Sequence, residues 1–217
     1  MFNVLTFECG PVATNCYLVG DDVSGLAFLV DAPKDSLRCV TEALTERGWK
    51  LSDILLTHTH WDHTADCLEL QRTSGARVVV HVADVYRLTD PMAHTIWPLP
   101  FTIPSVQTFE TIEGLSGMLT ILAGTATIAW VHTPGHTEGG ICFLDTTNEL
   151  AYVGDTLFAG SIGRTDLPGG NMEELCQSIK EQLFCLADTY TIFPGHGPTS
   201  TIGAERLMNP FVGLNAS

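Results

Sequence analysis

The 217-residue sequence has few basic residues: 10 lysines and arginines stand against 25 aspartates and glutamates, which gives a formal net charge of -15. Charged residues make up only 16% of the chain, compared with roughly 25% in an average soluble domain. Nucleic-acid binding needs clustered lysine and arginine to neutralise phosphates, so this composition argues against a nucleic-acid ligand. With 45% hydrophobic residues, the chain is also too apolar to be disordered.

Long hydrophobic runs are missing as well. No segment approaches the roughly 18–20 consecutive apolar residues of a membrane-spanning helix. The N-terminal segment lacks the basic stretch followed by an apolar stretch that is typical of a secretory signal. We therefore expect a cytoplasmic protein that does not associate with a membrane.

The seven cysteines contain no CxxC pair, are widely scattered and are odd in number. Neither a disulfide framework nor a thiolate zinc knot is expected from that pattern. We interpret each cysteine as a small buried hydrophobic residue or a bystander. Their positions are Cys9, Cys16, Cys39, Cys67, Cys142, Cys176 and Cys185.

No internal repeat, low-complexity tract or linker divides the chain, so we expect one domain over residues 1–217. Apolar residues at helical spacing predict helices from residue 35 to a stop at Gly48, around residues 67–70 and near residues 172–186. Short apolar runs predict strands at residues 16–19, 27–30, 54–56, 78–80, 118–122, 127–131, 141–144, 150–153 and 191–193. This pattern of strands and helices predicts an α/β layered sandwich.

Residues 86–112 are rich in proline and threonine, which restricts helices and central strands. The pattern predicts a long surface excursion that could overhang a site. His94, Trp97 and Phe101 are candidates to line such a lid.

Four potential metal ligands, His58, His60, Asp62 and His63, fall within six residues directly after the predicted strand at residues 54–56. In an extended chain His58, His60 and Asp62 project to one side, and a turn after Asp62 lets His63 converge with them. Imidazole and carboxylate are ligands for zinc, iron or manganese, and without a nearby cysteine a closed structural zinc site is not expected. The segment therefore predicts a metal site.

Three further side chains, His136, Asp155 and His196, share one local setting. Each follows an apolar strand and lies in a turn with a glycine, where the backbone can approach closely. One such residue alone would most often be structural. Together with the first cluster, the three strengthen the prediction of a metal site.

The ordered pattern HxHxDH, His, Asp, His resembles the signature of the metallo-β-lactamase superfamily, and the likeness spans nearly the whole chain. The resemblance implies a four-layer αβ/βα sandwich, with two mixed β-sheets face to face, helices on the outer faces and metals at one edge of the sheets. It also implies two divalent metal ions, zinc first, with iron and manganese as alternatives. By position, one ion would be held by His58, His60 and His136, the other by Asp62, His63 and His196, with Asp155 bridging both.

Within that superfamily, residues 133–137, 154–158 and the Gly-Arg-Thr-Asp segment at 163–166 resemble the glyoxalase II group of thioester hydrolases. The turn at residues 195–198 and the Asn-Pro-Phe at 209–211 are similar to short, single-domain bacterial relatives of that group. The resemblance implies a small-molecule thioester substrate, such as the glutathione-linked S-lactoylglutathione.

Hydrolysis also agrees with the chemistry of such a site. A residual positive charge lowers the pKa of bound water to about 7 and stabilises the oxyanion formed when metal-bound hydroxide attacks the carbonyl. Asp62 would bind metal and orient the hydroxide as the catalytic carboxylate. Arg164 would pair with a substrate carboxylate, or else lock the loop at residues 160–166.

Other conspicuous side chains lie outside the seven-ligand pattern. His81, His94 and His132 are interpreted as packing or surface residues. Trp61 lies inside the metal loop, but indole offers no lone pair to a metal, so a packing role is expected.

Two other functions remain open. The Gly-Arg-Thr-Asp segment also resembles persulfide dioxygenases, which would use a single iron held by His58, His136 and Asp155. A non-catalytic metal-binding domain is the second alternative. A secreted β-lactamase and a nucleic-acid-processing enzyme are disfavoured by the missing export signal and by the acidity. The sequence leaves the oligomeric state open.

Overall fold

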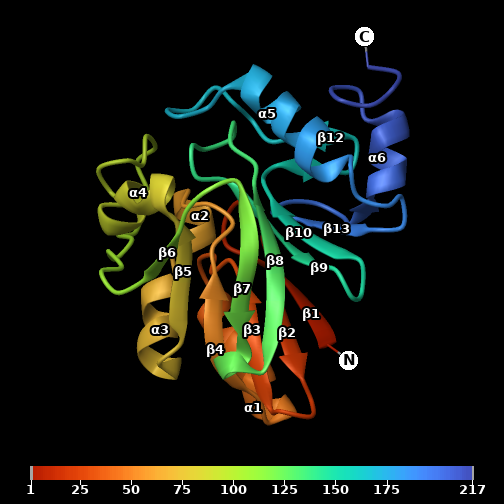
Figure 1. Ribbon diagram of the computed structural model, residues 1–217. Helices are drawn as coiled ribbons and strands as arrows, with labels where there is room; N and C mark the ends of the chain where they lie inside the picture. The colour runs from red at the N-terminus through yellow and green to blue at the C-terminus, as the bar shows by residue number, and fades with distance from the viewer. Residues whose placement is uncertain (1, 217) are drawn as a thin grey trace. The chain divides into compact units, whose positions relative to one another are not determined.

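The computed structural model describes residues 2–216, which form two compact units (Figure 1). Within the described residues, unit 1 consists of residues 2–112 with Thr120–Thr127, and unit 2 consists of Glu113–Leu119 with residues 128–216. Each unit is described by itself below. The expectation of a single domain over residues 1–217 stays a prediction.

The first sheet is mixed and has six strands in the order β1-β2-β3-β4-β5-β6. Its strands are β1 (Phe2–Cys9), β2 (Thr14–Asp21), β3 (Leu26–Val30), β4 (Lys50–Leu55), β5 (Arg77–His81) and β6 (Glu110–Ile112). Neighbours from β1 to β3 are antiparallel, whereas β3, β4, β5 and β6 run parallel. Wholly apolar runs predicted β3, β4 and β5 because these central strands are buried on both faces.

Two helices pack on one face of this sheet. They are α1 (Ser36–Arg47), which ends before Gly48 as predicted, and α3 (Cys67–Ser74). Val40 of α1 and Leu70 of α3 lie in one apolar core with strand residues such as Leu29. The remaining short elements are α2 (Trp61–Thr64), η1 (Val82–Asp84), α4 (Val85–Thr89) and η2 (Leu122–Gly124).

The second sheet is also mixed, in the order β14-β13-β10-β9-β8-β7. Its strands are β7 (Ser116–Ile121), β8 (Ala126–His132), β9 (Ile141–Asp145), β10 (Leu150–Gly154), β13 (Thr191–Pro194) and β14 (Ser200–Thr201). A separate hairpin is formed by β11 (Leu157–Phe158) and β12 (Ser161–Ile162). The predicted α/β fold with two mixed sheets and helices is confirmed.

The helix predicted near residues 172–186 is α5 (Met172–Ser178), which continues as a π-helical turn, η3 (Ile179–Leu183). The side chain of Asn171 caps it by accepting a hydrogen bond from the backbone N–H of Glu174 at 3.2 Å. Ile179 and Leu183 are fully buried in one core with strand residues such as Ile192. A further helix, α6 (Ile202–Met208), was not predicted because it is short and only two of its residues are buried.

Truncation of Leu183, a core residue of η3, tests how this segment packs in the core of unit 2. We expect Leu183→Ala to lower the free energy of unfolding by about 2–5 kcal/mol, because a fully buried side chain leaves a cavity that neighbours fill only in part. Urea unfolding measures the loss. Leu207→Ala is the matched control, since Leu207 is 50% exposed, and equal losses in the two variants would contradict this account of the core.

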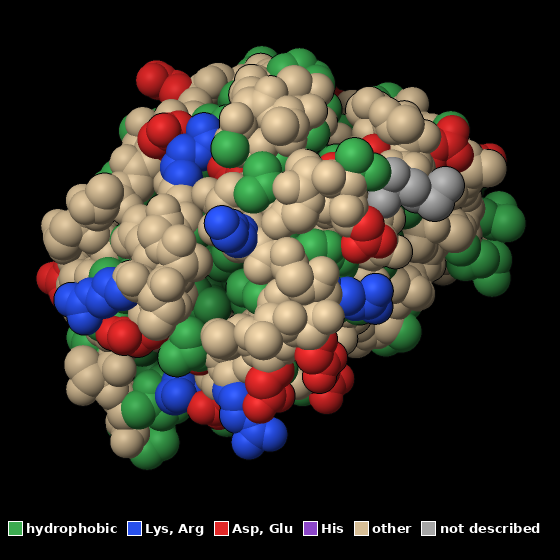
Figure 2. Space-filling view, turned by 90° about the horizontal axis from the view of Figure 1, so that it is seen from below, with side chains coloured by type: hydrophobic (Ala, Val, Ile, Leu, Met, Phe, Trp, Pro, Cys, Tyr) green, Lys and Arg blue, Asp and Glu red, His purple; other side chains and the backbone are tan. Residues whose placement is uncertain are grey.

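The few basic side chains are largely used in ion pairs. At least seven of the ten lysines and arginines lie within 4.0 Å of a carboxylate oxygen, among them Arg38 with Glu42 and Arg77 with Asp53. Figure 2 shows one face of the molecule, on which basic and acidic side chains lie next to one another and no histidine is visible. No helix within residues 2–216 is long and apolar enough to cross a membrane.

Candidate metal centre

The predicted ligands of unit 1 lie at one edge of the first sheet. Because β3, β4 and β5 are parallel neighbours, the residues that follow their carboxyl ends come together. Asp31 follows β3, the segment with His58 follows β4, and Asp84 lies just after β5. This edge therefore collects the four predicted ligands together with two aspartates that the sequence analysis did not single out.

The histidines of this edge form a compact cluster. The ring of His58 lies with its centroid 4.9 Å from that of His60 and 4.0 Å from that of His63. His63 is fully buried, and its Nε2 lies 3.5 Å from Oδ2 of Asp62. All four ligands predicted in this segment thus lie close together within unit 1.

Asp31 fixes the segment that carries His58 and His63 through hydrogen bonds. Its carboxylate accepts hydrogen bonds from the backbone N–H of Thr57 at 2.8 Å and from the Thr57 hydroxyl at 2.7 Å. Its Oδ2 also accepts a hydrogen bond from Nδ1 of His63 at 2.8 Å. Asp31 is 2% exposed and has a left-handed backbone with φ of 60°, which aspartate tolerates better than most residues.

These contacts determine which ring nitrogen faces a metal. A carboxylate can only accept, so Nδ1 of His63 carries the proton and Nε2 carries the lone pair. The Thr57 hydroxyl donates to Asp31, so at 3.2 Å it accepts from Nδ1 of His58, which leaves the lone pair on Nε2 of that ring too. Metal-binding histidines are held in this way by the nitrogen that does not bind the ion.

Asp84 holds the same segment through hydrogen bonds with Thr59. Its Oδ2 accepts a hydrogen bond from the backbone N–H of Thr59 at 2.9 Å, and its backbone oxygen accepts one from the Thr59 hydroxyl at 2.8 Å. Arg87 donates to Oδ1 of Asp84 at 3.0 Å, and both side chains are buried. Thr59 lies between His58 and His60, so this ion pair fixes the backbone that carries both rings.

Unit 2 builds a second cluster by the same topological principle. β8 and β10 are both antiparallel to β9, and β10 is parallel to β13, so β8, β10 and β13 run in one direction. Their carboxyl ends lie at one edge, where the loops after them carry His136, Asp155 and His196. The three ligands predicted from separate turns are therefore brought together within this unit.

The spacing of these three side chains fits metal coordination. Oδ2 of Asp155 lies 3.5 Å from Nε2 of His136 and 3.6 Å from Nε2 of His196. These distances exceed a normal hydrogen bond. Two ligands that each bind a tetrahedral metal at 2.0–2.1 Å are about 3.4 Å apart. The Asp62–His63 separation of 3.5 Å in unit 1 has the same value, so the donor sets of both units fit metal ions.

His136 is positioned by the Gly-Arg-Thr-Asp segment. Its Nδ1 donates a hydrogen bond to the backbone oxygen of Arg164 at 2.7 Å, which again leaves the lone pair on Nε2. Gly163 allows this approach, because a Cβ there would overlap the backbone oxygen of Asp155 and lie 3.2 Å from Nδ1 of His136. The segment therefore supports the ligand cluster through its backbone.

The side chain of Arg164 points instead to Asp166. Its Nε and a terminal nitrogen donate to the two carboxylate oxygens of Asp166 at 2.8 and 2.7 Å. This pairing lowers the pKa of Asp166 to about 2, and Arg164 remains 53% exposed at its side chain. Both predicted roles of Arg164, substrate binding and locking of the loop, stay predictions.

The proline-rich segment reaches the ligand loop of unit 1. Trp61 is buried with Ile103, and its ring centroid lies 5.9 Å from that of Phe101. Trp61 therefore packs, as predicted. Trp97 is 40% exposed, so the same segment also presents an exposed aromatic side chain.

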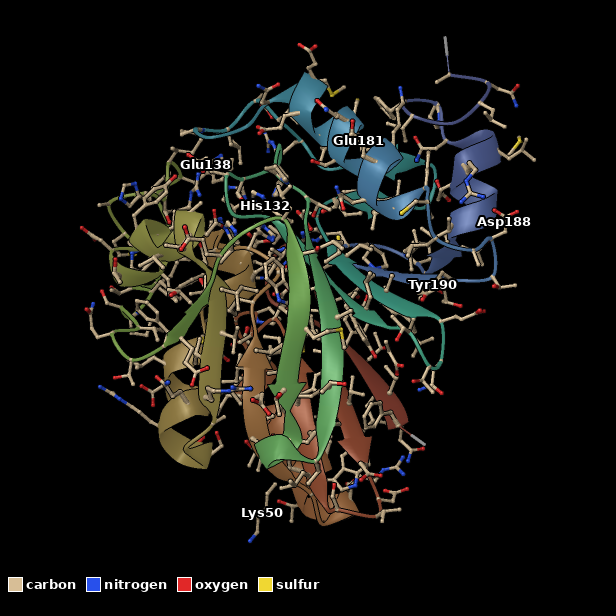
Figure 3. All side chains as sticks on the ribbon, viewed as in Figure 1. Lys50, His132, Glu138, Glu181, Asp188 and Tyr190 are labelled. Atoms are coloured by element: carbon tan, nitrogen blue, oxygen red, sulfur yellow. The ribbon has the colours of Figure 1, made fainter. Side chains whose placement is uncertain are left out.

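The histidines outside the ligand pattern have other partners. Nδ1 of His81 accepts a hydrogen bond from the backbone N–H of Ala83, and His94 packs against Tyr86. Nε2 of His132 donates to the backbone oxygen of Glu138 at 2.9 Å, and Figure 3 labels both residues. The interpretation of these three histidines as packing or surface residues stays a prediction.

Comparison with known sequences places this ligand pattern in a family. Residues 9–196 match the metallo-beta-lactamase superfamily, a span that contains all seven predicted ligands. The chain is 35% identical over 214 residues to the uncharacterized protein ML0493 of Mycobacterium leprae, covering 95% of this chain and 96% of that protein. It is 32% identical over 218 residues to hydroxyacylglutathione hydrolase GloC of Haemophilus influenzae, covering 96% of this chain and 98% of GloC.

Solved structures share the fold. The BLEG-1 B3 metallo-beta-lactamase matches with a TM-score of 0.88 and 32% identity, over 98% of this chain and 99% of that one. TTHA1623, crystallised in a di-iron-bound form, matches with a TM-score of 0.81 and 30% identity, over 96% of this chain and 100% of that one. The predicted α/β sandwich of this family is thereby confirmed. The chain belongs to the metallo-beta-lactamase superfamily.

Proposed function

We propose that this protein is a binuclear metal-dependent hydrolase that cleaves a small thioester such as S-lactoylglutathione. The observation that carries the proposal is the position of Asp155, whose Oδ2 is nearly equidistant from Nε2 of His136 and of His196. A carboxylate between two imidazoles that serve different ions is suited to bridge them. The first ion would be held by His58, His60 and His136, the second by Asp62, His63 and His196, and Asp155 would contact both.

The donor set is nitrogen and carboxylate oxygen, which suits zinc, iron or manganese. Bound divalent ions would lower the pKa of a water ligand to about 7 and stabilise the negative charge that develops on a carbonyl oxygen. The di-iron form of TTHA1623 supports iron as an alternative to zinc.

Asp62 is the candidate catalytic carboxylate among this chain's residues. The hydroxyl of Thr14 donates a hydrogen bond to Oδ2 of Asp62 at 3.1 Å, and Nε2 of His63 lies 3.5 Å from the same oxygen. The hydrogen bond from Thr14 orients the carboxylate, which lets it accept a proton from an attacking water in a set direction. A thiolate leaving group needs little proton assistance, so one such carboxylate is sufficient.

The name of GloC supports a glutathione thioester as the substrate, because that relative aligns over nearly its whole length. BLEG-1 is a B3 metallo-beta-lactamase by name, and it is 32% identical to this chain, as GloC is. This similarity favours β-lactam hydrolysis as a second candidate function. Both reactions attack a carbonyl carbon, so the arrangement of ligands alone does not separate them.

Hydrolysis of S-lactoylglutathione by the purified, metal-replete protein tests the proposal. Turnover is followed by loss of thioester absorbance, with a His58→Ala preparation as the control that lacks one ligand. We expect turnover by the unmodified protein and none by the variant. A cephalosporin is assayed alongside, and its hydrolysis without thioester hydrolysis would reverse the ranking of the two substrates.

Two other results would overturn the proposal. Oxygen uptake with glutathione persulfide by the iron-loaded protein, without thioester hydrolysis, would establish the persulfide dioxygenase alternative. Stoichiometric metal binding without turnover of any of these substrates would favour a non-catalytic metal-binding domain.

Arg164 is proposed to bind an anionic group of the substrate. We expect Arg164→Ala to raise KM for S-lactoylglutathione about 10-fold while kcat and metal content stay unchanged, because a hydrogen bond to a charged group is lost. Steady-state kinetics and metal analysis measure this split. Lys180→Ala removes a cation elsewhere in the same unit as a control. An unchanged KM would leave Arg164 with only the structural role of locking its loop.

A further inference from the structure

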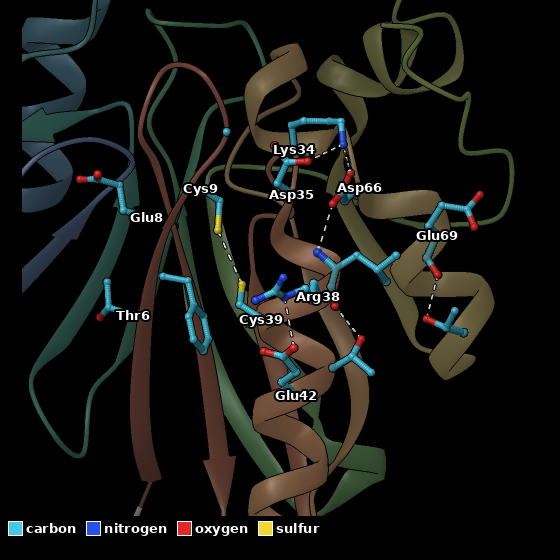
Figure 4. A pocket seen from close by; sticks show the side chains of 15 residues that line it. Thr6, Glu8, Cys9, Lys34, Asp35, Arg38, Cys39, Glu42, Asp66 and Glu69 are labelled. Atoms are coloured by element: carbon cyan, nitrogen blue, oxygen red, sulfur yellow. Dashed lines mark hydrogen bonds and ion pairs between the residues drawn. The ribbon is translucent and has the colours of Figure 1, made fainter.

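Two cysteines line an open groove on unit 1, far in sequence from the predicted ligands (Figure 4). The groove has a volume of about 1250 Å³ and lies where the end of β1 meets the first turns of α1. Cys9 is the last residue of β1, and Cys39 lies in the first turn of α1. We propose that Cys9 and Cys39 form an oxidation site, at which a hydroperoxide converts the two thiols to a disulfide. The proposal does not depend on the substrate of the metal centre.

The two sulfur atoms lie close enough to form a disulfide after a small movement. Sγ of Cys9 lies 3.7 Å from Sγ of Cys39, and Figure 4 shows both side chains directed toward each other. Closing a disulfide needs the sulfurs to approach by roughly a further 1.7 Å. Both residues are only partly buried, so a small oxidant can enter from the groove. All seven cysteines lie within the described residues 2–216, and none is in a disulfide.

A third cysteine, Cys16, gives the thiols of Cys9 and Cys39 different pKa values. In the β1–β2 register Cys16 is paired with Phe7, which places its side chain on the same face of the sheet as Cys9. Cys16 donates a hydrogen bond to Cys9, and with the contact from Cys39 this lowers the pKa of Cys9 to about 7. Burial, together with the charges of Asp35 and Asp66, opposes this lowering. The thiolate form of Cys9 is therefore well populated at neutral pH.

Cys39 and Cys16 remain thiols under the same conditions. Burial and the adjacent Cys9 raise the pKa of Cys39 to about 12. The pKa of Cys16 is raised well above its usual value by the hydrogen bond to Cys9 and by complete burial. The thiol of Cys39 also donates a hydrogen bond to the backbone oxygen of Ser36 at 3.2 Å. This contact and the pKa differences together assign Cys9 as the attacking sulfur and Cys39 as the resolving sulfur.

The reaction balances with hydrogen peroxide as the oxidant. The Cys9 thiolate attacks one peroxide oxygen, the O–O bond breaks, and the departing hydroxide takes a proton to become water, leaving a sulfenic acid on Cys9. The sulfur of Cys39 then attacks that of Cys9, the S–O bond breaks, and the hydroxide leaves as a second water with the Cys39 proton. Two thiols are oxidised to one disulfide, and the peroxide is reduced to two waters.

Peptide mapping of the full-length protein after hydrogen peroxide treatment tests the proposal. Remaining thiols are alkylated before digestion. Trypsin leaves Cys39 on residues 39–47 and leaves Cys9 and Cys16 together on residues 1–34. We expect a cross-linked pair of these peptides that lacks two hydrogens and separates on reduction. Fragmentation of the pair must place the bond on Cys9, and a bond on Cys16 or no cross-link would overturn the proposal.

Single substitutions distinguish the cysteine that attacks the peroxide from the cysteine that then forms the disulfide with it. In Cys39→Ser, Cys9 should stop at the sulfenic acid and react with a dimedone probe, whereas in Cys9→Ser neither Cys39 nor Cys16 should be labelled. Cys185→Ser is the control, because Cys185 is an exposed cysteine of unit 2, and its cross-link yield should equal that of the unmodified protein.

The rate of dimedone labelling of Cys9 tests its reactivity directly, because a cysteine that only packs in the core would not be labelled faster than other thiols. At pH 7 a thiol with a pKa near 7 should react about threefold faster than an ordinary exposed thiol, after allowing for its lower intrinsic nucleophilicity. In Cys39→Ser we expect dimedone to label Cys9 faster than Cys185. Labelling of Cys185 that equals or exceeds that of Cys9 would contradict the assignment of Cys9 as the reactive sulfur.

Discussion

Asp155→Asn is expected to abolish thioester hydrolysis and to weaken metal binding by more than about 100-fold, beyond the range typical of residues that only support a ligand. The substitution keeps the size of the side chain but removes its negative charge. In unit 2 that charge lies 3.5 Å from Nε2 of His136 and 3.6 Å from Nε2 of His196. A neutral amide oxygen cannot offset the repulsion between two divalent ions.

Metal content after dialysis and a competitive titration with a chelator measure the loss. Asp188→Asn serves as the control in the same unit, because Asp188, labelled in Figure 3, is an exposed carboxylate. Its side chain pairs with Arg206. The control should retain metal and activity. Two tightly bound ions in Asp155→Asn would show that this carboxylate does not bridge the metals and would contradict the proposed ligand set.

Asp31→Asn is expected to have the second largest effect, although Asp31 binds no metal in the proposed scheme. One amide nitrogen would replace an oxygen that now accepts hydrogen bonds from Thr57 or His63, and a buried donor would then lack an acceptor. We expect metal affinity to fall about 10–100-fold, as for other partners that orient a ligand. The free energy of unfolding should fall by about 1–3 kcal/mol. Asparagine also tolerates the left-handed backbone at this position, so backbone strain would not explain the loss.

Asp53→Asn separates loss of stability from loss of ligand orientation. Asp53 is also 2% exposed, but it accepts hydrogen bonds from Arg77 and from the backbone N–H of Leu122, and it contacts no predicted ligand. Denaturant unfolding and metal titration are compared for the two variants. Asp53→Asn should be destabilised and keep its metal affinity. An equal fall in metal affinity in both variants would mean that general loosening of unit 1, and not the orientation of His63, is responsible.

The elements that the sequence predicted best have a strong local pattern. α1 was recognisable from its apolar spacing and the stop at Gly48, and the central strands from their wholly apolar runs. The seven predicted ligands were recognisable because four are concentrated in one segment and three follow strands in glycine turns. The order of these residues along the chain then indicated the family.

Other features depend on which strand ends become neighbours, and no local pattern records that. Asp31 and Asp84 support the ligand loop only because β3, β4 and β5 are adjacent and parallel. Asp31 did carry a usable signal, since it follows an apolar strand just as Asp155 does. β1 escaped prediction because most of its residues are only partly buried, which weakens the alternation expected of a strand.

The segment with His58 and His63 is largely buried, whereas parts of the proline-rich segment at residues 86–112 are exposed. This difference affects which residues can change during evolution. His63 is held by the buried carboxylate of Asp31, and His58 is held by the buried hydroxyl of Thr57, so substitutions around them are expected to disturb both stability and metal binding. Ile96 and Trp97 are 58% and 40% exposed, so they can change with little effect on the folded state. Surface loops on a rigid scaffold are where recognition diverges most readily. In the proposed scheme, new specificities would arise by replacement of exposed residues of this segment, while the predicted metal ligands stay unchanged.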